Sequence, residues 1–238
     1  MSPCHVRANR VILPAGSPDF GIRQAEARVT FPNAHAASLL LHVLRAWHRA
    51  DMGKIVISEN VSLDGVIEDP AGDEGFSRGG WVGLIKDRPG VGKLALDEAM
   101  GSEALLLGRR TYEWFAARWP SRSGELADRL NSLPKYVVSS TLEEPDWNNS
   151  TVLDGDVVDA VSTLKQEIKG EIAVPGSSQL VRMLLEHDLA DELRLKVFPI
   201  VLGDGERLFG ETSAKKPLRL VDSKTVDDDV AVLTYEVV

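Results

Sequence analysis

The most informative stretch of this sequence is Ala104–Tyr112, which reads ALLLGRRTY. Its run of apolar residues fits a short buried strand, Gly108 allows a close backbone turn, and a helix is expected from about Thr111. Free N–H groups at a helix start attract phosphate, and the guanidiniums of Arg109 and Arg110 would add charge-assisted hydrogen bonds. The alternative is a turn with two solvated arginines, but the pattern favours an anion site.

The alternation of strand and helix continues on both sides of this stretch. Strands are expected at Lys54–Val61, Ala104–Leu107, Lys135–Ser139, Thr151–Leu153, Glu171–Val174 and Glu192–Pro199, and helices at Val91–Met100, Thr111–Arg118, Val157–Ile168 and Ser178–His187. Such alternation predicts a mainly parallel sheet covered by helices on both faces. The last two strand-like runs, Leu218–Val226 and Val230–Val238, are joined only by Asp227–Asp229 and predict an antiparallel hairpin with a solvated acidic turn.

A break in composition near Met52 divides the chain. Residues 1–51 hold the only cysteine, four of the five histidines, six arginines, no lysine and three acids. We expect a poorly ordered N-terminal extension over residues 1–51, with one helical segment near residues 34–49, and a single domain over residues 52–238. A docking helix is the alternative for that segment, and the layout of a secretory signal is absent.

Composition limits the chemistry of the 52–238 region. It carries 21 basic and 33 acidic side chains, a net charge of −12, with His187 as its one histidine and no cysteine. A disulfide framework, a structural zinc site and a cysteine nucleophile are therefore excluded, while magnesium held by oxygen ligands stays possible. The net charge of −9 for the whole chain argues against a nucleic-acid partner. No apolar run is long enough for a membrane span, so a cytoplasmic protein is expected.

Three further polar loops follow expected strands, where open α/β sheets bind ligands. The hydroxyls of Ser139–Thr141 could hold a ribose phosphate, although a turn or helix cap is the commoner use of such residues. The loop Pro175–Ser178 resembles a glycine-poor pyrophosphate cradle, and the full fingerprint of an ordinary dinucleotide-binding domain is absent. In Ser62–Gly65, Asp64 could face a substrate or handle a proton, or it could simply form an Asp-Gly turn.

Taken together, these loops resemble the reductase-domain family that includes dihydrofolate reductase and the C-terminal reductase domain of the bifunctional riboflavin-biosynthesis deaminase-reductase. The resemblance runs from about Met52 to Val238 and rests on VSLDG, LLLGRRTYE, LPKYVVS, LADELRL and PIVLGDG, in that order. It implies a dihydrofolate-reductase-like fold, with a mixed, mostly parallel central sheet flanked by helices. It also implies NADPH as cofactor, a small pterin- or pyrimidine-like substrate and a homodimer.

The same resemblance assigns roles to residues. It places NADPH phosphates at Gly108, Arg109, Arg110 and Thr111, the 2′-phosphate near one of these arginines with Ser139 and its neighbour Ser140, the pyrophosphate and nicotinamide side at Gly176, Ser177 and Ser178, and the substrate at Asp64. Two departures stand out. Riboflavin-type members usually carry V-E-G-G where this chain has Val174–Ser177, and dihydrofolate reductases carry an acid on the first long helix, for which Asp87 and Asp97 are the candidates here.

The leading hypothesis is therefore an NADPH-dependent reductase of a small heterocycle. Hydride transfer needs positioning, a proton and the exclusion of water, which suits a site without cysteine, histidine or metal. The alternative is a catalytically silent nucleotide-binding or regulatory module on the same fold.

Overall fold

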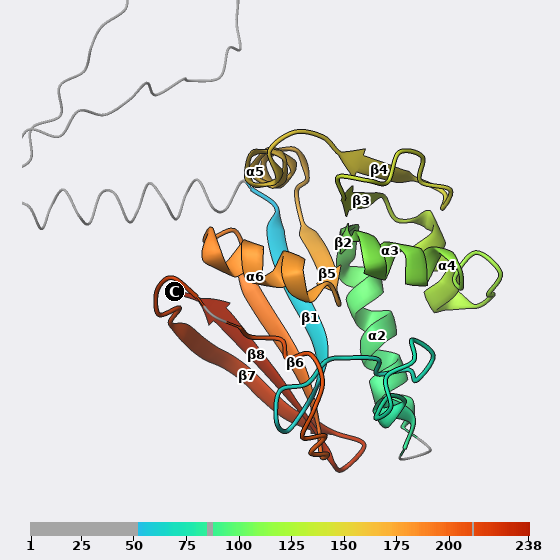
Figure 1. Ribbon diagram of the computed structural model, residues 1–238, viewed down its shortest axis with the longest axis vertical. Coiled ribbons are helices and arrows are strands. Elements are labelled where there is room, and N and C mark those ends of the chain that lie inside the picture. Colours follow the sequence, from blue (N-terminus) through green and yellow to red (C-terminus); the bar gives the residue numbers. More distant parts are fainter. Residues whose placement is uncertain (1–51, 85–87, 211) are drawn as a thin grey trace, which may run out of the picture. The chain divides into compact units, whose positions relative to one another are not determined.

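The computed structural model describes residues 52–84, 88–210 and 212–238 (Figure 1). The predicted extension, with its helical segment near residues 34–49, lies outside the described residues, and so does Asp87. Within the described part of the chain, no helix is long and apolar enough to cross a membrane.

One eight-stranded sheet organises the fold, in the order β4-β3-β2-β5-β1-β6-β8-β7. The strands are β1 (Lys54–Ser62), β2 (Ser102–Gly108), β3 (Lys135–Val138), β4 (Ser150–Leu153), β5 (Glu171–Pro175), β6 (Glu192–Phe198), β7 (Leu218–Val226) and β8 (Val230–Val237). The strands from β4 to β6 are parallel, and β8 and β7 continue the sheet as an antiparallel hairpin beside β6. The predicted mixed, mostly parallel sheet with a C-terminal hairpin is confirmed.

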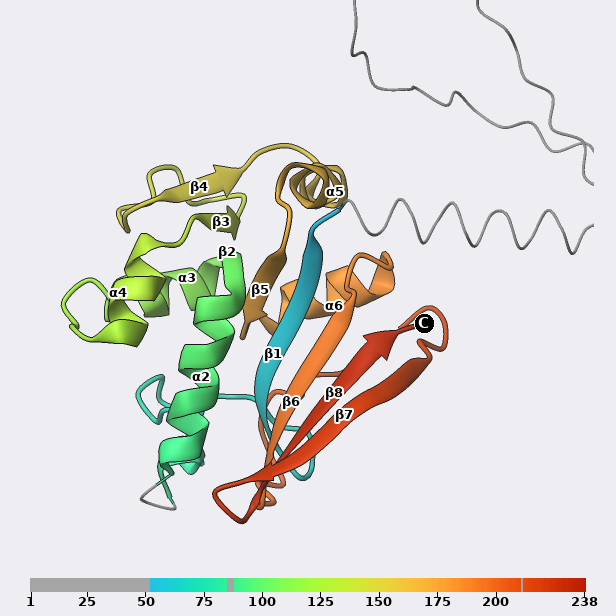
Figure 2. The ribbon, with the colours of Figure 1, turned by 180° about the vertical axis from the view of Figure 1, so that it is seen from behind.

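Helices cover both faces of this sheet. They are α2 (Pro89–Gly101), α3 (Arg109–Ala116), α4 (Glu125–Ser132), α5 (Val157–Glu167) and α6 (Ser178–Glu186), with a 3-10 turn, η1, at Trp81–Gly83. Residues of α5 and α6 pack in one core cluster with Ile57 and Leu106, whereas α2, α3 and α4 share a second cluster with Leu105 and Leu107. Neighbouring residues of β2 thus feed opposite cores, as a parallel strand buried on both faces requires. Accordingly, α6 lies in front of the sheet in Figure 1 and α2 lies in front of it in Figure 2.

Three details differ from the sequence-based expectations. Helix α4 was not predicted, and α3 begins at Arg109 rather than Thr111, so both arginines belong to its first turn. The turn of the hairpin is not simply solvated, because the two carboxylate oxygens of Asp227 accept hydrogen bonds from the N–H groups of Gly90 and Val91, each at 2.9 Å. These are N–H groups of the first turn of α2, so the C-terminal hairpin caps a helix that begins 138 residues earlier in the chain.

Candidate active site

The site lies where two neighbouring parallel strands send their connections to opposite faces of the sheet. Strand β1 leads to α2 on one face, and its neighbour β5 leads to α6 on the other. Such a reversal is a topological switch point, the place where open α/β sheets bind ligands. A cleft of about 1800 Å³ opens there and is lined by residues from the ends of β1, β2, β3 and β5. That volume exceeds the 300–1,000 Å³ typical of a pocket for one small ligand.

The loop after β2 is hydrogen-bonded to the loop after β5. The N–H of Gly108 donates to Ser177 Oγ at 2.9 Å, and Ser177 Oγ lies 2.9 Å from Thr111 Oγ1. A Cβ at Gly108 would lie 3.3 Å from the Ser177 side chain, so this position suits glycine. The structure thus brings two of the sequence-predicted loops together at the carboxyl ends of adjacent strands.

The loop after β3 joins the same group through Arg109. Its Nη1 donates to Thr141 Oγ1 at 2.5 Å, and its Nε donates to Glu113 Oε1 at 2.7 Å. The Ser139 hydroxyl accepts from the N–H groups of Thr141 and Leu142, which is the turn role weighed for it from the sequence. Ser139 and its neighbour in the chain both line the cleft.

Arg110 is placed differently from Arg109. Its side chain is 77% exposed, and its ion-pair partner is Glu74 at 3.9 Å. Both arginines line the cleft, but Arg109 is the one that contacts the loop after β3. An exposed pair at this distance holds a guanidinium only weakly, so Arg110 can turn toward a ligand at little cost.

The start of α6 is shaped by two residues in the left-handed region. Gly176 has φ +61°, and Ser177, the N-cap, has φ +69°, a conformation uncommon for a residue other than glycine. This backbone turns the first N–H groups of α6, which have no acceptor within the helix, toward the switch point. The Ser178 hydroxyl donates to Glu206 Oε1 at 2.6 Å, so this hydroxyl already has a partner inside the protein.

Asp64 lies outside the residues that line the cleft. Its carboxylate accepts hydrogen bonds from the N–H groups of Leu202 and Gly203, at 3.0 and 2.7 Å, and from the Ser62 hydroxyl at 2.7 Å. These bonds lower the pKa of Asp64 to about 2, with the Leu202 N–H as the largest cause. The geometry therefore fits the turn role left open by the sequence, and it does not show Asp64 facing a substrate.

The acid that α2 presents to the cleft is Glu98. Its Oε2 lies 2.8 Å from Ser58 Oγ and 2.9 Å from the ammonium group of Lys196. Asp97, the candidate chosen from the sequence, instead pairs at 2.5 Å with the exposed Lys93 and does not line the cleft. One residue along a helix turns a side chain by about 100°, so the sequence identified the correct helix but the wrong face.

Sequence reasoning missed Glu59, which also lines the cleft. It belongs to β1, on the same side of the strand as the core residues Ile55 and Ile57, and is only 5% exposed. Burial raises its pKa to about 8, against the opposing effects of the Lys196 charge and a hydrogen bond from the Gly176 N–H. The available signal was an acid at a position where the alternation of the strand predicts a core side chain.

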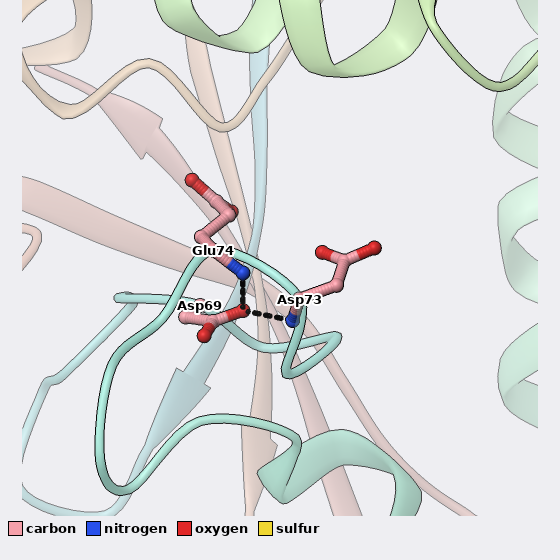
Figure 3. A group of neighbouring side chains, drawn as sticks. All are labelled: Asp69, Asp73 and Glu74. Atoms are coloured by element: carbon pink, nitrogen blue, oxygen red, sulfur yellow. Dashed lines mark hydrogen bonds between the residues drawn. The ribbon is translucent and has the colours of Figure 1, made fainter.

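Asp69, Asp73 and Glu74 form an acidic group at the edge of the cleft (Figure 3). Oδ1 of Asp69 accepts the N–H groups of Gly72, Asp73 and Glu74 at 2.8–3.1 Å, and Oδ2 accepts that of Phe76 at 3.1 Å. The buried carboxylate of Asp69 is thus engaged by backbone donors and organises the loop around it. We assign no metal to this group.

The described geometry can be compared with known proteins. Residues 53–232 match the family described as the RibD C-terminal domain. The chain belongs to this family. Two proteins of Bacillus subtilis (strain 168), both named as uncharacterized, are similar to it. YyaP is 27% identical over 187 residues, which cover 76% of this chain and 94% of YyaP, and YwjB is 26% identical over 172 residues, which cover 72% and 91%.

Solved structures support the same fold. A protein from Shewanella sp. PV-4, named as a candidate riboflavin biosynthesis protein, aligns with a TM-score of 0.63 at 24% identity, over 78% of this chain and 99% of its own. The diaminohydroxyphosphoribosylaminopyrimidine deaminase/5-amino-6-(5-phosphoribosylamino)uracil reductase of Thermotoga maritima aligns with a TM-score of 0.53 at 16% identity, over 85% of this chain and 60% of its own. These likenesses confirm the predicted dihydrofolate-reductase-like fold.

Proposed function

We propose that this member of the RibD C-terminal domain family is an NADPH-dependent reductase of a small pyrimidine- or pterin-like heterocycle. The observation that carries the proposal is the hydrogen-bonded junction of three loops at the topological switch point, through Gly108, Ser177 and Arg109. Hydride-transfer enzymes depend on the protein to position the cofactor against the substrate, and such a junction fixes the cradle in advance. The name of the Thermotoga maritima structure, a pyrimidine reductase, supports the substrate class.

The residues present fit a dinucleotide with an extra phosphate. The first turns of α3 and α6 open on one cleft, and their N–H groups lack acceptors within the helices, which suits phosphate oxygens. Arg109, fixed beside the loop after β3, would contact the 2′-phosphate together with Ser139 and Ser140. Arg110, Thr111, Gly176, Ser177 and Ser178 would surround the pyrophosphate and nicotinamide side. NADPH bound there would supply the hydride, and the cleft walls would exclude water from it.

A steady-state assay separates this function from the silent nucleotide-binding module. NADPH oxidation would be followed with a panel containing 5-amino-6-(5-phosphoribosylamino)uracil, its unphosphorylated riboside, dihydrofolate and simple pterins. We expect reduction of at least one compound. NADPH binding measured by fluorescence titration, with no turnover of any panel member, would favour the silent module instead.

Cofactor choice gives a sharper test. Because NADPH differs from NADH only by the 2′-phosphate, and a hydrogen bond to a charged group contributes about 1.5–3 kcal/mol, we expect Arg109→Ala to weaken NADPH binding by roughly tenfold or more while changing NADH binding much less. Arg110→Ala should weaken both cofactors alike, because Arg110 does not contact the loop after β3. Titration of both cofactors against the two variants measures this.

The control for that titration is Arg219→Ala, which removes an exposed arginine paired with Glu236 on the C-terminal hairpin, away from the cleft lining. It should leave both affinities unchanged. An NADPH/NADH affinity ratio that is the same in wild type and Arg109→Ala would show that this loop does not bind the 2′-phosphate.

We also propose that the protein acts in the cytoplasm as a homodimer. Strand β7 forms one edge of the sheet and is exposed from Leu218 to Thr225, with Leu220 and Val221 at 50% and 45%. An exposed apolar edge strand favours pairing with another chain. Light scattering after gel filtration would give the mass of the particle, and a monomer would contradict the dimer.

A further inference from the structure

Glu59 lies at the point where strands β1 and β5 separate. The register of β1 with β5 ends at the pair Ser58–Pro175, whereas its register with β6 continues to Ser62–Phe198. From Glu59 onward, β1 therefore has a hydrogen-bonded neighbour on one side only, at the switch point described above. An ionisable side chain at this position is placed where a ligand would enter the sheet.

The Glu59 side chain is held in a dry environment with one oxygen unused. It is 5% exposed, it lines the cleft, and its Oε1 is buried without a hydrogen-bond partner among the described residues. The Gly176 N–H hydrogen-bonds to the carboxyl group. A buried polar atom without a partner costs free energy, so a ligand group that pairs with Oε1 gains from this position.

The protonation state follows from the same burial. With its pKa raised to about 8, Glu59 is mostly protonated at neutral pH and can donate a hydrogen bond or a proton. A carboxylic acid that is neutral at pH 7 is suited to general-acid catalysis, because its pKa lies close to the operating pH.

The other buried acids in the described part of the chain are already engaged. Asp69 accepts four backbone N–H groups, and Glu192, outside the cleft lining, pairs with Lys54 and Arg194. Glu98, which is partly buried at the cleft, pairs with Lys196. Among the described buried carboxyl groups, Glu59 alone combines a place in the cleft with an oxygen that has no partner.

We propose that Glu59 is the general acid that protonates the substrate during its reduction, an assignment that rests on the reductase function proposed above. The carbon of a substrate C=N or C=O bond accepts the hydride of the dihydronicotinamide, which is thereby oxidised. The π electron pair of the substrate moves to nitrogen or oxygen, and this atom takes the proton from the Glu59 carboxyl group. Glu59 is left as a carboxylate and regains a proton from water before the next cycle.

The first test uses the protein without cofactor or substrate. Infrared difference spectra between pH 6 and pH 10 should show a buried carboxylic-acid carbonyl band that disappears on alkaline titration, with a midpoint near 8. Glu59→Gln should lack this band, and Glu103→Gln, which makes the same substitution at an exposed residue of β2 outside the cleft lining, should keep it. A wild-type spectrum without the band would show an ionised Glu59 at neutral pH and overturn the proposal.

The second test separates proton donation from cofactor binding. On the panel compound that the wild type reduces, Glu59→Gln should lower kcat by about 100-fold or more, in the range of general-acid catalysis, with the NADPH dissociation constant changed less than about twofold. Wild-type kcat should fall above about pH 8, as the acid loses its proton, and the variant should lack this limb. Glutamine preserves the shape of the side chain and donates hydrogen bonds but transfers no proton.

The outcomes distinguish this proposal from the one on which it rests. If the wild type reduces a panel compound and Glu59→Gln keeps its kcat but loses NADPH affinity, Glu59 binds the cofactor and the general acid is another group. If the wild type reduces none of the compounds, the reductase function fails and the catalytic role of Glu59 fails with it, whatever the infrared titration shows.

Discussion

Glu59 and Asp64 lie in one strand and the turn that follows it, yet their pKa values move in opposite directions, to about 8 and about 2. Burial dominates at Glu59, whereas at Asp64 two backbone N–H groups and a hydroxyl stabilise the charged form. At the residue scale, the surroundings of a carboxyl group decide its chemistry more than the motif in which it occurs.

Asp64 is expected to stabilise the fold rather than to take part in catalysis. Asp64→Ala removes three hydrogen bonds to a carboxylate and leaves the N–H groups of Leu202 and Gly203 without their acceptor, so we expect the free energy of unfolding to fall by about 1–3 kcal/mol at pH 7. The folded pKa of Asp64 lies below its ordinary value of 3.8, so its contribution is present above that pH and is lost as pH falls toward 2. Urea unfolding at several pH values measures both effects.

The control is Asp222→Ala, an exposed aspartate on β7, which should change the unfolding free energy by less than about 0.5 kcal/mol. A gap between wild type and Asp64→Ala that widens below pH 4 would have the wrong sign for this linkage. Unchanged stability together with a large loss of kcat would instead return Asp64 to the substrate.

The candidate site could be predicted from the sequence only in part, for a physical reason. The GRRT motif locates an anion site because a strand end, a glycine and two arginines act through local geometry. Glu59 could not be found in that way, because its burial depends on where β5 stops, at Pro175, more than a hundred residues away. The face of α2 that meets the cleft likewise depends on packing, and the choice of Asp97 over Glu98 followed from that.

At the scale of elements, strands were predicted well where apolar runs are continuous, as in β2. Helix α4 was missed because it is eight residues long and its buried side chains are only Ala127 and Leu130. Its N-cap, Gly124, has φ +110° and makes no side-chain cap, so the usual sequence signal for a helix start is absent. A helix this short gains its stability from packing, which a sequence pattern of one turn cannot show.

The contact between the C-terminal hairpin and α2 allows a prediction at this scale. Asp227 accepts two N–H groups of the first turn of α2, and its negative charge lies at the positive end of the helix dipole. We expect Asp227→Ala to lower the free energy of unfolding by about 1–2 kcal/mol more than Asp228→Ala does. Both residues have positive φ, 51° and 65°, so the two alanines carry a similar backbone cost and the difference isolates the cap.

Thermal or urea unfolding of the two variants measures that difference. Equal destabilisation would show that the hairpin turn contributes only its own backbone and that α2 begins as well without Asp227. Close packing supports the contact, because a Cβ at Gly90 would lie 2.5 Å from the Val226 side chain. The helix start and the turn are therefore fitted to each other.

For the whole molecule, charge limits what the cleft can bind. The chain is net −9, and in the described residues the cleft is lined by four cations, Arg109, Arg110, Arg194 and Lys196. The two arginines of α3 belong to the proposed cofactor end. The two cations of β6 must then serve the substrate end, where Glu59 and Glu98 also lie.

The cations of β6 are not available to an anion without cost. Arg194 pairs with Glu171 at 2.8 Å and Glu192 at 2.6 Å, and Lys196 pairs with Glu98 at 2.9 Å, with both cations mostly buried. A phosphate that took either cation would leave a partly buried carboxylate without its partner, which is strongly unfavourable. The substrate end is therefore suited to a heterocycle without a phosphate group.

This argument leads to a prediction about substrate choice. Between a riboside and the 5′-phosphate of the same heterocycle, such as the two forms of 5-amino-6-(ribosylamino)uracil, we expect kcat/KM to be at least about tenfold higher for the unphosphorylated compound, a difference of about 1.4 kcal/mol. Initial rates with both compounds at saturating NADPH measure it, and raising the salt concentration should narrow the gap by screening the repulsion. A preference for the phosphate would mean that Arg194 or Lys196 exchanges its carboxylate for the ligand. In that case, Lys196→Met should abolish the preference if Lys196 makes the exchange, and leave it intact if Arg194 does.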